Sequence, residues 1–592
     1  MKMKIFRFLL CLVTAAVLSN SRARANVYAT DIKLNGSLSS ITSPASSPVT
    51  ITYRLNQAAT LGVTVTILSG STQVATLSGG TNMGLNTVVW GGTNSSGGTV
   101  GSGTYSVSIT AAASGFTNWQ QISVDANAGN YAFDPNGMAV DNNTNSPYYG
   151  RVVVGCSFAN GTATNPISGD IILDGIYKMN ADGSFADEGG FGYGGYTMDD
   201  GGHLSTNEMP SASAVVPWRL RIGDDDRIYM LDWSDEGAIS SFDMQVTAYK
   251  IVIDDGGVDG GTLGGPHSFA GNPDLADLAY GIINFDVTST TTTNAAVWLC
   301  DADYPNWGIW TYHLVNGQSD TNDTGTQAVT TGGDLSLVSS GGCSVDSSLD
   351  IFCGQDRNGE NAVYDGMVFT NWNAGILPPI SSGFNLVDGT AVGQVGWGYG
   401  CGVDTTCTTD PTFEGVQDVV INSRTSPTIV AFPTTAGNDD TNGSGIRLLD
   451  TTDGSIVETN IDFGQQYPCA AWDNVGNLYG ASSSRNVWRA WSPPGASTNT
   501  TVAVAQVILS PGLLRIATVT AVSTGPGSAT VTINFTAPGS PAPTVFTLLG
   551  SPTVNGTYTV VSSAGITGGS GAYQATFPAS ATSFYEVKQT SQ

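Results

Sequence analysis

The sequence predicts an all-β protein with an N-terminal Ig-like β-sandwich, a central six- or seven-bladed β-propeller and a C-terminal β-sandwich. Glycine is abundant, at 75 of 592 residues, and only 11% of the residues are charged. Short runs alternate apolar and polar residues between Gly, Ser, Asn and Asp turns, and almost no stretch has a helical period. In addition, one strand motif recurs through the centre of the chain, as expected of propeller blades.

Residues 1–25 have the features of a secretory signal peptide. Basic residues open the chain, an apolar run covers residues 8–18, and Ala23-Arg24-Ala25 fits a small-x-small cleavage site. The apolar run is shorter than the roughly 20 residues that a membrane-spanning helix needs. We therefore expect an exported protein, secreted or at the cell surface, with no membrane insertion. Cleavage would remove five basic residues, changing the net charge from −28 to 15 − 48 = −33.

Residues 26–125 are predicted as the Ig-like sandwich. Residues 47–68 alternate apolar and polar side chains, and further strands are expected at residues 73–77, 86–90 and 104–111. The segments 84–90 (GLNTVVW) and 95–105 (SSGGTVGSGTY) resemble the Ig-like domain of the flagellar hook-cap protein type. That family usually has Asp after the Trp, where this chain has Gly91. Because such domains recur as spacers in exported bacterial proteins, the resemblance implies architecture and not a flagellar function.

Residues 126–515 are predicted as the propeller because a strand motif that usually starts and ends with Gly recurs there. Its copies begin at Gly175, Gly308, Gly366, Gly445 and Asn486, with a shortened copy at residues 237–243. We expect an Asp or Asn where the first strand of each repeat meets its turn, because these side chains bond the backbone two residues on. The expected residues are Asp141, Asp224, Asp286, Asp346, Asn422 and Asp473.

This repeat is similar to the NHL and gluconolactonase-like group of β-propellers, and GMAVD at residues 137–141 is one of its best copies. Six blades are visible, and the long interval between Asp141 and Asp224 has room for a seventh. A sandwich array or a β-helix is the competing architecture.

Residues 516–592 are predicted as the C-terminal β-sandwich, with strands at residues 529–535, 544–549, 556–562, 572–577 and 584–587. Its short strand motifs resemble C-terminal modules of exported bacterial proteins. The resemblance implies an accessory domain and no specific activity.

Cysteine usage fits an oxidising compartment, where disulfides are permitted. Cys401 and Cys407 enclose a short loop, and Cys343 and Cys353 flank a predicted hairpin turn, so both pairs are disulfide candidates. The remaining connectivity cannot be read from the sequence. Neither a Cys-x-x-Cys motif nor a zinc-type Cys/His spacing is found.

The sequence predicts no catalytic or cofactor-binding residue. Its three histidines, His203, His267 and His313, do not form the axial set that some propeller lyases and lactonases use. Carboxylates in predicted loops, such as Asp199-Asp200 and residues 224–226, are interpreted as solvated turn residues. The alternative is that some of them bind Ca²⁺. The aromatic group around Trp298 and Trp310 is interpreted as packing between blades rather than a sugar platform.

The negative net charge argues against nucleic-acid and anionic-membrane partners. The favoured interpretation is a secreted or cell-surface, non-enzymatic protein that presents a propeller face to a glycan or protein partner. A calcium-dependent propeller enzyme, either a polysaccharide lyase or a lactonase, is the alternative. A structural envelope component is the third hypothesis.

Overall fold

A computed structural model describes most of the sandwich and the C-terminal domain, and the strands of the propeller. The described residues are 26–44, 47–156, 162–173, 175–186, 196–197, 217–223, 227–234, 243–250, 282–291, 294–301, 308–315, 318–319, 326–330, 340–345, 351–355, 366–369, 395–399, 417–422, 428–434, 444–450, 456–510, 515–526, 528–537, 542–579 and 584–589. The predicted signal peptide lies outside them.

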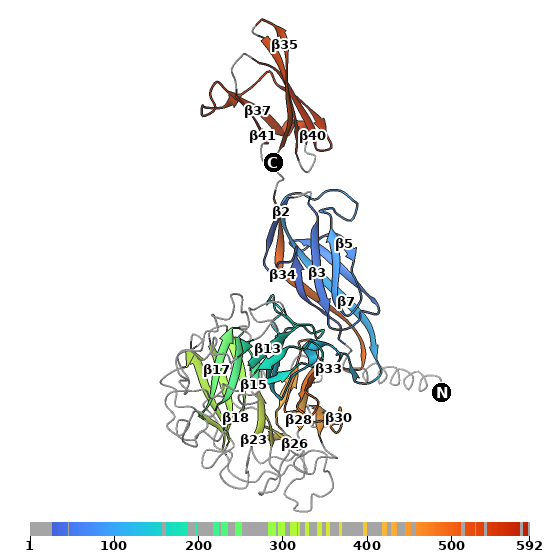
Figure 1. Cartoon of the computed structure of the whole chain (residues 1–592), viewed down its shortest axis with the longest axis vertical. Helices are drawn as coiled ribbons and strands as arrows, with labels where there is room; N and C mark the ends of the chain where they lie inside the picture. The colour runs from blue at the N-terminus through green and yellow to red at the C-terminus, as the bar shows by residue number, and fades with distance from the viewer. Residues whose placement is uncertain are drawn as a thin grey trace, which may run out of the picture.

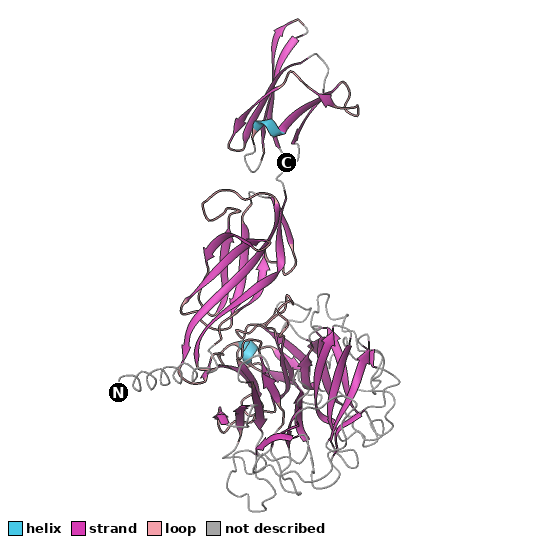
Figure 2. Ribbon diagram, turned by 180° about the vertical axis from the view of Figure 1, so that it is seen from behind, coloured by secondary structure: helices cyan, strands magenta, loops and turns pink. Residues whose placement is uncertain are grey.

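The described chain is all-β, as the sequence predicts, and forms three bodies in a row (Figures 1 and 2). The propeller is at one end, the N-terminal sandwich in the middle and the C-terminal domain at the other end. Only two short 3-10 helices occur in the described residues, η1 (Ala128–Asn130) and η2 (Pro543–Val545). None of the helices described there is long and apolar enough to cross a membrane.

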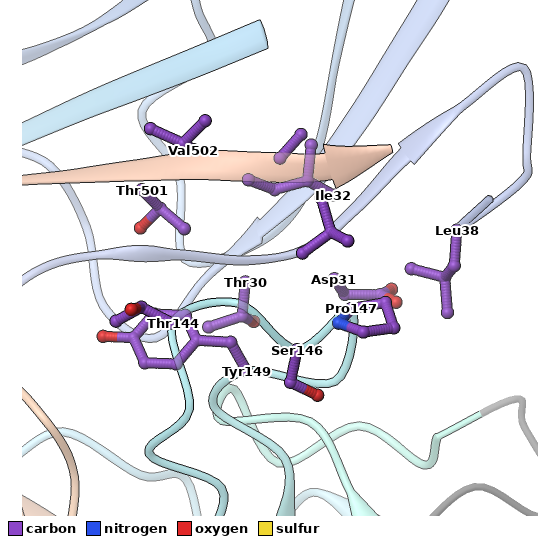
Figure 3. Close-up of a pocket in the computed structure, with 12 residues that line it drawn as sticks. Thr30, Asp31, Ile32, Leu38, Thr144, Ser146, Pro147, Tyr149, Thr501 and Val502 are labelled. Atoms are coloured by element: carbon purple, nitrogen blue, oxygen red, sulfur yellow. The ribbon is translucent and has the colours of Figure 1, made fainter. Parts of the chain in front are cut away.

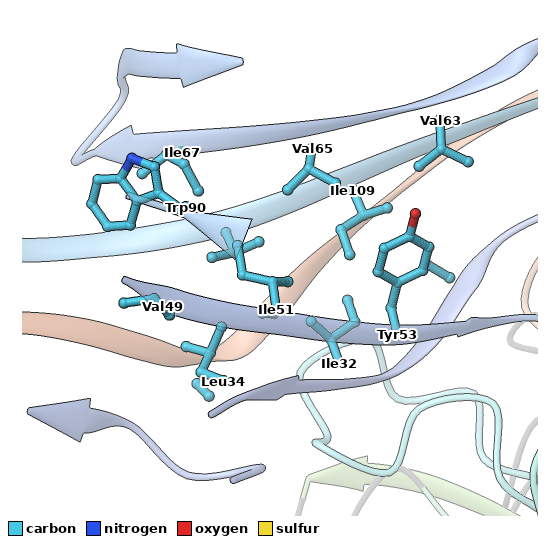
Figure 4. Packing of buried hydrophobic residues seen from close by; sticks show 14 of the residues in the cluster. Ile32, Leu34, Val49, Ile51, Tyr53, Val63, Val65, Ile67, Trp90 and Ile109 are labelled. Atoms are coloured by element: carbon cyan, nitrogen blue, oxygen red, sulfur yellow. The ribbon is translucent and has the colours of Figure 1, made fainter. Parts of the chain in front are cut away.

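The N-terminal sandwich consists of two sheets whose inner faces share one core. The first sheet contains β1 (Ala29–Leu34), β3 (Val49–Leu55) and β6 (Gly84–Trp90). The second has the order β2 (Ile41–Pro44), β34 (Gly495–Ser510), β7 (Gly103–Phe116), β4 (Gly62–Ser69) and β5 (Thr72–Ser78). Alternate side chains such as Ile51, Val65 and Ile109 point between the sheets and are fully buried with Trp90 (Figure 4). The predicted period-two pattern therefore builds this core.

Strand β34 belongs to the sandwich although it follows the propeller in the sequence. It pairs antiparallel with β7 and parallel with β2, and buries Val507 and Leu509 in the sandwich core. This corrects the predicted boundary, which placed residues 496–515 with the propeller. The alternating pattern identifies a strand but does not specify which sheet it joins. The propeller is thus inserted between two neighbouring strands of the sandwich.

The propeller contains six described sheets of three to five strands. Within each sheet, the strands are named in the order in which they lie side by side. The first two sheets are β9 (Pro135–Val140), β10 (Val152–Cys156), β13 (Gly175–Met179) and β14 (Tyr196–Thr197), and then β15 (Pro217–Ile222), β16 (Arg227–Ser234) and β17 (Asp243–Lys250). The third sheet is β18 (Ile282–Thr291), β19 (Asn294–Asp301), β20 (Gly308–Val315) and β21 (Gln318–Ser319), with β22 (Thr326–Thr330) also paired to β20, and the fourth is β23 (Ser340–Val345), β24 (Ile351–Gln355), β25 (Gly366–Phe369) and β26 (Val395–Tyr399). The last two sheets are β27 (Val420–Asn422), β28 (Ile429–Thr434), β29 (Gly445–Asp450) and β30 (Ile456–Ile461), and then β31 (Cys469–Trp472), β32 (Leu478–Ser482), β33 (Val487–Ser492) and β8 (Gln120–Gln121). A separate hairpin joins β11 (Thr162–Thr164) to β12 (Ile171–Leu173).

The first strands of these sheets contact one another in turn: β9 with β15, then β18, β23, β27 and β31, and β31 again with β9. This arrangement is a ring around a central axis. Strand β8 supplies the last strand of the final sheet and so closes the ring. This corrects the predicted end of the sandwich at residue 125, because β8 belongs to the propeller. The choice between six and seven blades stays a prediction.

The recurring motif forms the third strand of its sheet in five places, at β13, β20, β25, β29 and β33. The shortened copy precedes β17 and lies, apart from Asp243, outside the described residues. Asp141 and Asp473 end their strands and accept backbone N–H bonds from Asn143 and Val475, as predicted. Asp286 does not mark a turn, because β18 continues past it to Thr291. The prediction at Asp286 is therefore wrong, because the residues that follow it up to Thr291 are still strand.

The described residues of the C-terminal domain form two sheets with a common hydrophobic cluster. The first sheet has the order β35 (Arg515–Gly525), β36 (Ser528–Thr536), β40 (Ala572–Ala579) and β39 (Gly565–Gly569). The second has the order β38 (Thr559–Val560), β37 (Phe546–Ser551) and β41 (Phe584–Gln589). Phe535 and Tyr573 stack in this cluster, and Phe546 packs against both rings.

Candidate functional site

Two sites of buried polar side chains stand out: the seam between sandwich and propeller, and the propeller axis. The seam is the contact of residues 26–57 with residues 141–182 and 473–492. On one side of the seam, Asp31 lies at a bulge in β1 and has a φ of +50°. A left-handed conformation is tolerated by Asp, and a bulge redirects a side chain out of the regular ladder. The Asp31 carboxylate is thereby turned toward the propeller.

Asp31 is the centre of an ion-pair network that spans the seam. Its Oδ1 atom accepts from Nη2 of Arg151 at 3.1 Å, and Arg151 comes from the propeller. Its Oδ2 atom lies 3.3 Å from Nε of Arg54, and Nη1 of Arg54 lies 2.9 Å from Oδ2 of Asp182 on the propeller. Arg151 and Asp31 are 1% and 4% exposed, so water screens their attraction little. The network therefore fixes the sandwich against the propeller.

A second polar group crosses the same seam around Asn26. The backbone N–H of Asn26 donates to Oγ of Ser492 at 3.1 Å, and its carbonyl accepts from Nδ2 of Asn477 at 2.9 Å. Asn477 Nδ2 also lies 2.6 Å from Oδ2 of Asp473. Because these bonds attach the last sheet of the propeller insertion to the start of the sandwich, they complement the contacts that Arg151 and Asp182 make from its first sheet.

Burial shifts the titration of groups in this second cluster. Desolvation raises the pKa of Asp473 from 3.8 to about 6, although bonds from Asn477, Val475 and Tyr479 oppose the shift. Burial also raises the pKa values of Tyr28 and Tyr479 well above their usual value. Their hydroxyl oxygens are 3.4 Å apart across the seam. The seam is thus a buried, hydrogen-bonded contact.

A small pocket opens beside the seam (Figure 3). It is lined from the sandwich by Asp31, Leu38 and Val502, and from the propeller by Ser146 and Tyr149. Its volume of about 20 Å³ holds roughly one water molecule. Ligand pockets are on the order of 300 Å³ or more, so this notch does not accommodate a substrate.

The propeller axis is crossed by side chains from nearly opposite sheets. Arg221 of β15 places Nη2 2.5 Å from Oδ1 of Asp418, which lies two residues before β27. The sheets of β15 and β27 are three steps apart in the ring, so this ion pair bridges the axis. Asp418 is fully buried, and a buried pair of this kind requires further hydrogen bonds. Its Oδ2 accepts from the N–H of Ala470 on β31.

Arg219 extends the same cluster. Its Nη1 donates to the carbonyl of Asn136 on β9 at 2.6 Å, and its Nη2 donates to the carbonyl of Gln417 at 2.9 Å. Arg219 is 1% exposed. Together the two arginines tie the sheets of β9, β15 and β27 to one another. At this level the axis is filled by guanidinium groups and one carboxylate, which is an arrangement for holding the ring together.

Cys469 lies on β31 beside this cluster and is fully buried. Burial raises the pKa of its thiol from 9.0 to about 12, against the smaller effect of Arg219. A thiol that stays protonated at neutral pH is a poor nucleophile and metal ligand. Cys469 is therefore a packing residue.

Ring closure has its own ion pairs. Arg489 on β33 places Nη2 2.5 Å from Oδ2 of Asp125 and Nη1 2.5 Å from Oδ2 of Asp462. Asp125 follows β8, so the ion pair reinforces the pairing of β8 with β33. These contacts raise the pKa of the Arg489 guanidinium, with burial opposing them.

The disulfide candidates have different outcomes. The antiparallel register of β23 and β24 places Cys343 directly opposite Cys353, a spacing that suits a disulfide. Their pairing stays a prediction. Cys401 and Cys407 lie outside the described residues, as do His203 and His267. His313 lies on the third strand β20.

The calcium and aromatic hypotheses fall mostly on undescribed residues. In the described part of the chain, no group of three or more His, Cys, Asp or Glu residues is arranged to hold a metal ion. Residues 199–200 and 224–226 lie outside that part. Trp298 is 1% exposed, which fits packing and leaves no face for a sugar.

Sequence reasoning missed Asp31, Arg219, Arg221 and Asp418. One signal was present: the chain has only 20 Lys and Arg residues, yet two arginines alternate on one predicted inner strand, WRLRI at residues 218–222. In a strand this spacing puts both side chains on the same face. Asp418, which pairs with Arg221, is nearly 200 residues away, and the sequence gives no signal for that pairing.

Comparisons with known proteins agree with the sandwich assignment. Residues 39–115 match the FlgD Ig-like domain, which covers the sandwich strands from β2 almost to the end of β7 but not β34. No curated protein sequence matches the chain at a significant level.

Three solved structures align with the chain at low similarity. The first is a structural genomics protein of unknown function from Bacteroides thetaiotaomicron, with 10% identity, 79% of this chain and 98% of that chain covered, and a TM-score of 0.33. The WD40 β-propeller domain of Doa1 has 12% identity, 64% and 97% coverage, and a TM-score of 0.29. The Dos1 propeller has 11% identity, 78% and 94% coverage, and a TM-score of 0.26. Scores this low carry no argument, so the propeller assignment here follows from the ring of sheets.

Proposed function

We propose that this is an exported, non-enzymatic binding protein that presents its propeller to a glycan or protein partner. The observation that carries the proposal is the seam. The propeller is inserted into the sandwich through two chain crossings, and buried ion pairs at Asp31 and hydrogen bonds at Asn26 hold it there. A binding face held in one orientation loses less rotational freedom when it engages a partner.

The filled axis supports binding over catalysis. A metal-dependent lyase or lactonase needs coordination positions that are open to substrate. At the described level of the axis, Arg221 pairs with Asp418, and Arg219 donates to the carbonyls of Asn136 and Gln417. The enzyme alternative would have to use residues outside the described ones.

The sequence indicates where a partner would bind. The sequence intervals between consecutive described strands are long at residues 251–281, 370–394 and 400–416. Long connections on a rigid scaffold are common binding elements. The acidic charge of the chain makes a neutral glycan or a basic protein surface the favoured partner chemistry.

The test measures retention of purified residues 26–592 on a panel of immobilised neutral polysaccharides, with Ca²⁺ or with chelator, and scores new chain ends in the same samples. We expect retention without new ends. The matched control lacks residues 117–494. It joins Phe116 to Gly495, which pair in the β7–β34 ladder, and so keeps every sandwich strand.

Loss of retention in this control would assign binding to the propeller. Equal retention would move the binding site to the other two domains and contradict the proposal. New chain ends that disappear with chelator would replace it with the enzyme alternative. Absence of retention on every polysaccharide would restrict the proposal to a protein partner, to be sought by cross-linking on intact cells.

A further inference from the structure

Strand β35 is an edge strand that is exposed on both faces. Among the described strands it pairs only with β36, so its other side presents a row of backbone groups for pairing. Ile516, Val519 and Val522 are 48%, 58% and 65% exposed. The strand runs from the linker that follows the sandwich to the outer end of the C-terminal domain (Figure 1).

The exposure arises because the two sheets of this domain differ in width. Val519 lies opposite Ile533 and Ala521 opposite Val531 in the β35–β36 ladder, so all four side chains face the core side. Ile533 and Val531 are buried in the hydrophobic cluster, but no described residue of β35 joins it. Among the described strands, the facing sheet has three against four and leaves β35 uncovered.

The middle of this edge carries no device that normally prevents strand pairing. Natural edge strands are blunted by charged side chains, proline or bulges that twist them away. Residues 516–525 (IATVTAVSTG) contain neither a charged residue nor a proline. The ladder with β36 is irregular only near the two ends of the strand, between Ile516 and Thr518 and between Ser523 and Gly525. The stretch from Thr518 to Ser523 is regular and free of such protection.

The charge distribution indicates what covers the edge. Of 48 acidic residues in the chain only Glu586 lies in residues 515–592, which also contain Arg515 and Lys588. The domain is nearly neutral on a chain of net charge −28. Two copies of the chain repel each other through their sandwiches and propellers but not through this domain.

We propose that β35 pairs antiparallel with β35 of a second copy, joining two four-stranded sheets across a two-fold axis near Thr520. Val519 and Ala521 lie two residues apart on the core-side face of the strand, so Val519 of each copy meets Ala521 of the other there. An isologous pairing of this kind uses up both edges and closes after two copies. An unrelated protein strand would satisfy the backbone as well, but the neutral domain removes the repulsion that opposes self-association.

The dimer would be bivalent. The C-terminal domain and the propeller lie at opposite ends of the molecule (Figure 1). Pairing through β35 therefore leaves the two propellers at the two outer ends of the dimer. Two linked sites raise the apparent affinity for a repetitive surface. The dimer itself stands independently of what the propeller binds.

The test is light scattering with size-exclusion chromatography on purified residues 26–592 over a range of concentrations. We expect a dimer that becomes at least tenfold weaker in V519K/V522K, where charges occupy both faces of the strand. The matched control is V554K, because Val554 is 60% exposed in the same domain but lies off the edge. It should dimerise like the wild type.

Thermal unfolding and circular dichroism of all three proteins establish that the variants fold. A wild type that is monomeric at every concentration would overturn the proposal. So would a dimer that persists unchanged in V519K/V522K, or one that V554K weakens equally. If the double variant does not fold, a Thr520→Cys variant decides: oxidation should give a disulfide-linked dimer, and its absence would overturn the proposal.

Discussion

The sandwich is joined to its two neighbours in opposite ways. Toward the propeller the chain crosses twice, at the ends of β7 and β34, and buried ion pairs at Asp31 span the contact. Toward the C-terminal domain the chain crosses once, and the described hydrogen bonds of that domain stay inside it. We therefore expect sandwich and propeller to unfold as one unit and the C-terminal domain to unfold as a second.

The largest expected effect comes from truncating the chain on either side of β34. A chain that ends at residue 494 loses Val507 and Leu509 from the sandwich core, together with Ala503 and Ala505. Burial of a Val or Leu side chain contributes about 1.5–3 kcal/mol, and whole proteins are stable by about 5–15 kcal/mol. The lost strand pairing adds to this, so we expect the sandwich not to fold.

The control chain ends at residue 512 and keeps β34. Its sandwich and propeller should unfold at the wild-type temperature by calorimetry, while the transition of the C-terminal domain disappears. If both truncations unfold the sandwich, the two junctions are equivalent and the comparison fails.

The next effect tests the ion pairs of the seam. Arg151→Leu leaves Asp31 with less compensation in a buried site, and breaking a buried pair costs about 3–5 kcal/mol. We expect the sandwich–propeller transition to fall in denaturant titrations while the C-terminal transition is unchanged. Arg485→Leu is the matched control, because Arg485 is 43% exposed and 4.0 Å from Asp462. Equal effects of the two variants would show that the seam is no stronger than a surface contact.

The two junctions also show how far the sequence can be read. The sandwich strands were predictable because one buried face imposes a period of two, whereas the third strands of the propeller sheets were predictable because their motif recurs. The insertion of the propeller into the sandwich was not predictable. The alternating pattern of β34 suits any half-buried sheet, and its partner β7 is nearly 400 residues away. The contacts of Asp31 and Asp418 depend on ring closure, which brings distant residues together without any local signal. The turn predicted at Asp286 is wrong because the residues that follow it continue strand β18.

A smaller effect concerns the predicted disulfide between Cys343 and Cys353. A bridge between these paired strands closes a short loop and should stabilise the propeller by roughly 3 kcal/mol. Peptide mapping of non-reduced protein should recover one linked peptide that contains both residues. Reduction should then lower the sandwich–propeller transition and leave the C-terminal transition, whose domain contains no cysteine, where it was. Recovery of both thiols in alkylated form would contradict the prediction.

The smallest effect is a pH dependence confined to the seam. The pKa of Asp473 is raised by burial from 3.8 to about 6, so the folded protein binds this proton more tightly than the unfolded chain. The stabilisation is therefore full below about pH 4 and is lost as the pH rises through 6. Asp473→Asn removes this titration, so between pH 4 and 7 the variant should lose about 2 kcal/mol less stability than the wild type.

The control for this prediction is Asp170→Asn, which alters an exposed carboxylate of the propeller. The free energy of unfolding of this variant should change with pH as that of the wild type does between pH 4 and 7. The C-terminal transition should also be indifferent to Asp473→Asn, since that domain makes none of the seam's contacts. A pH slope that Asp473→Asn leaves unchanged would mean that water reaches the seam. In that case two chain crossings alone, and not a dry contact, would distinguish the propeller junction from the C-terminal one.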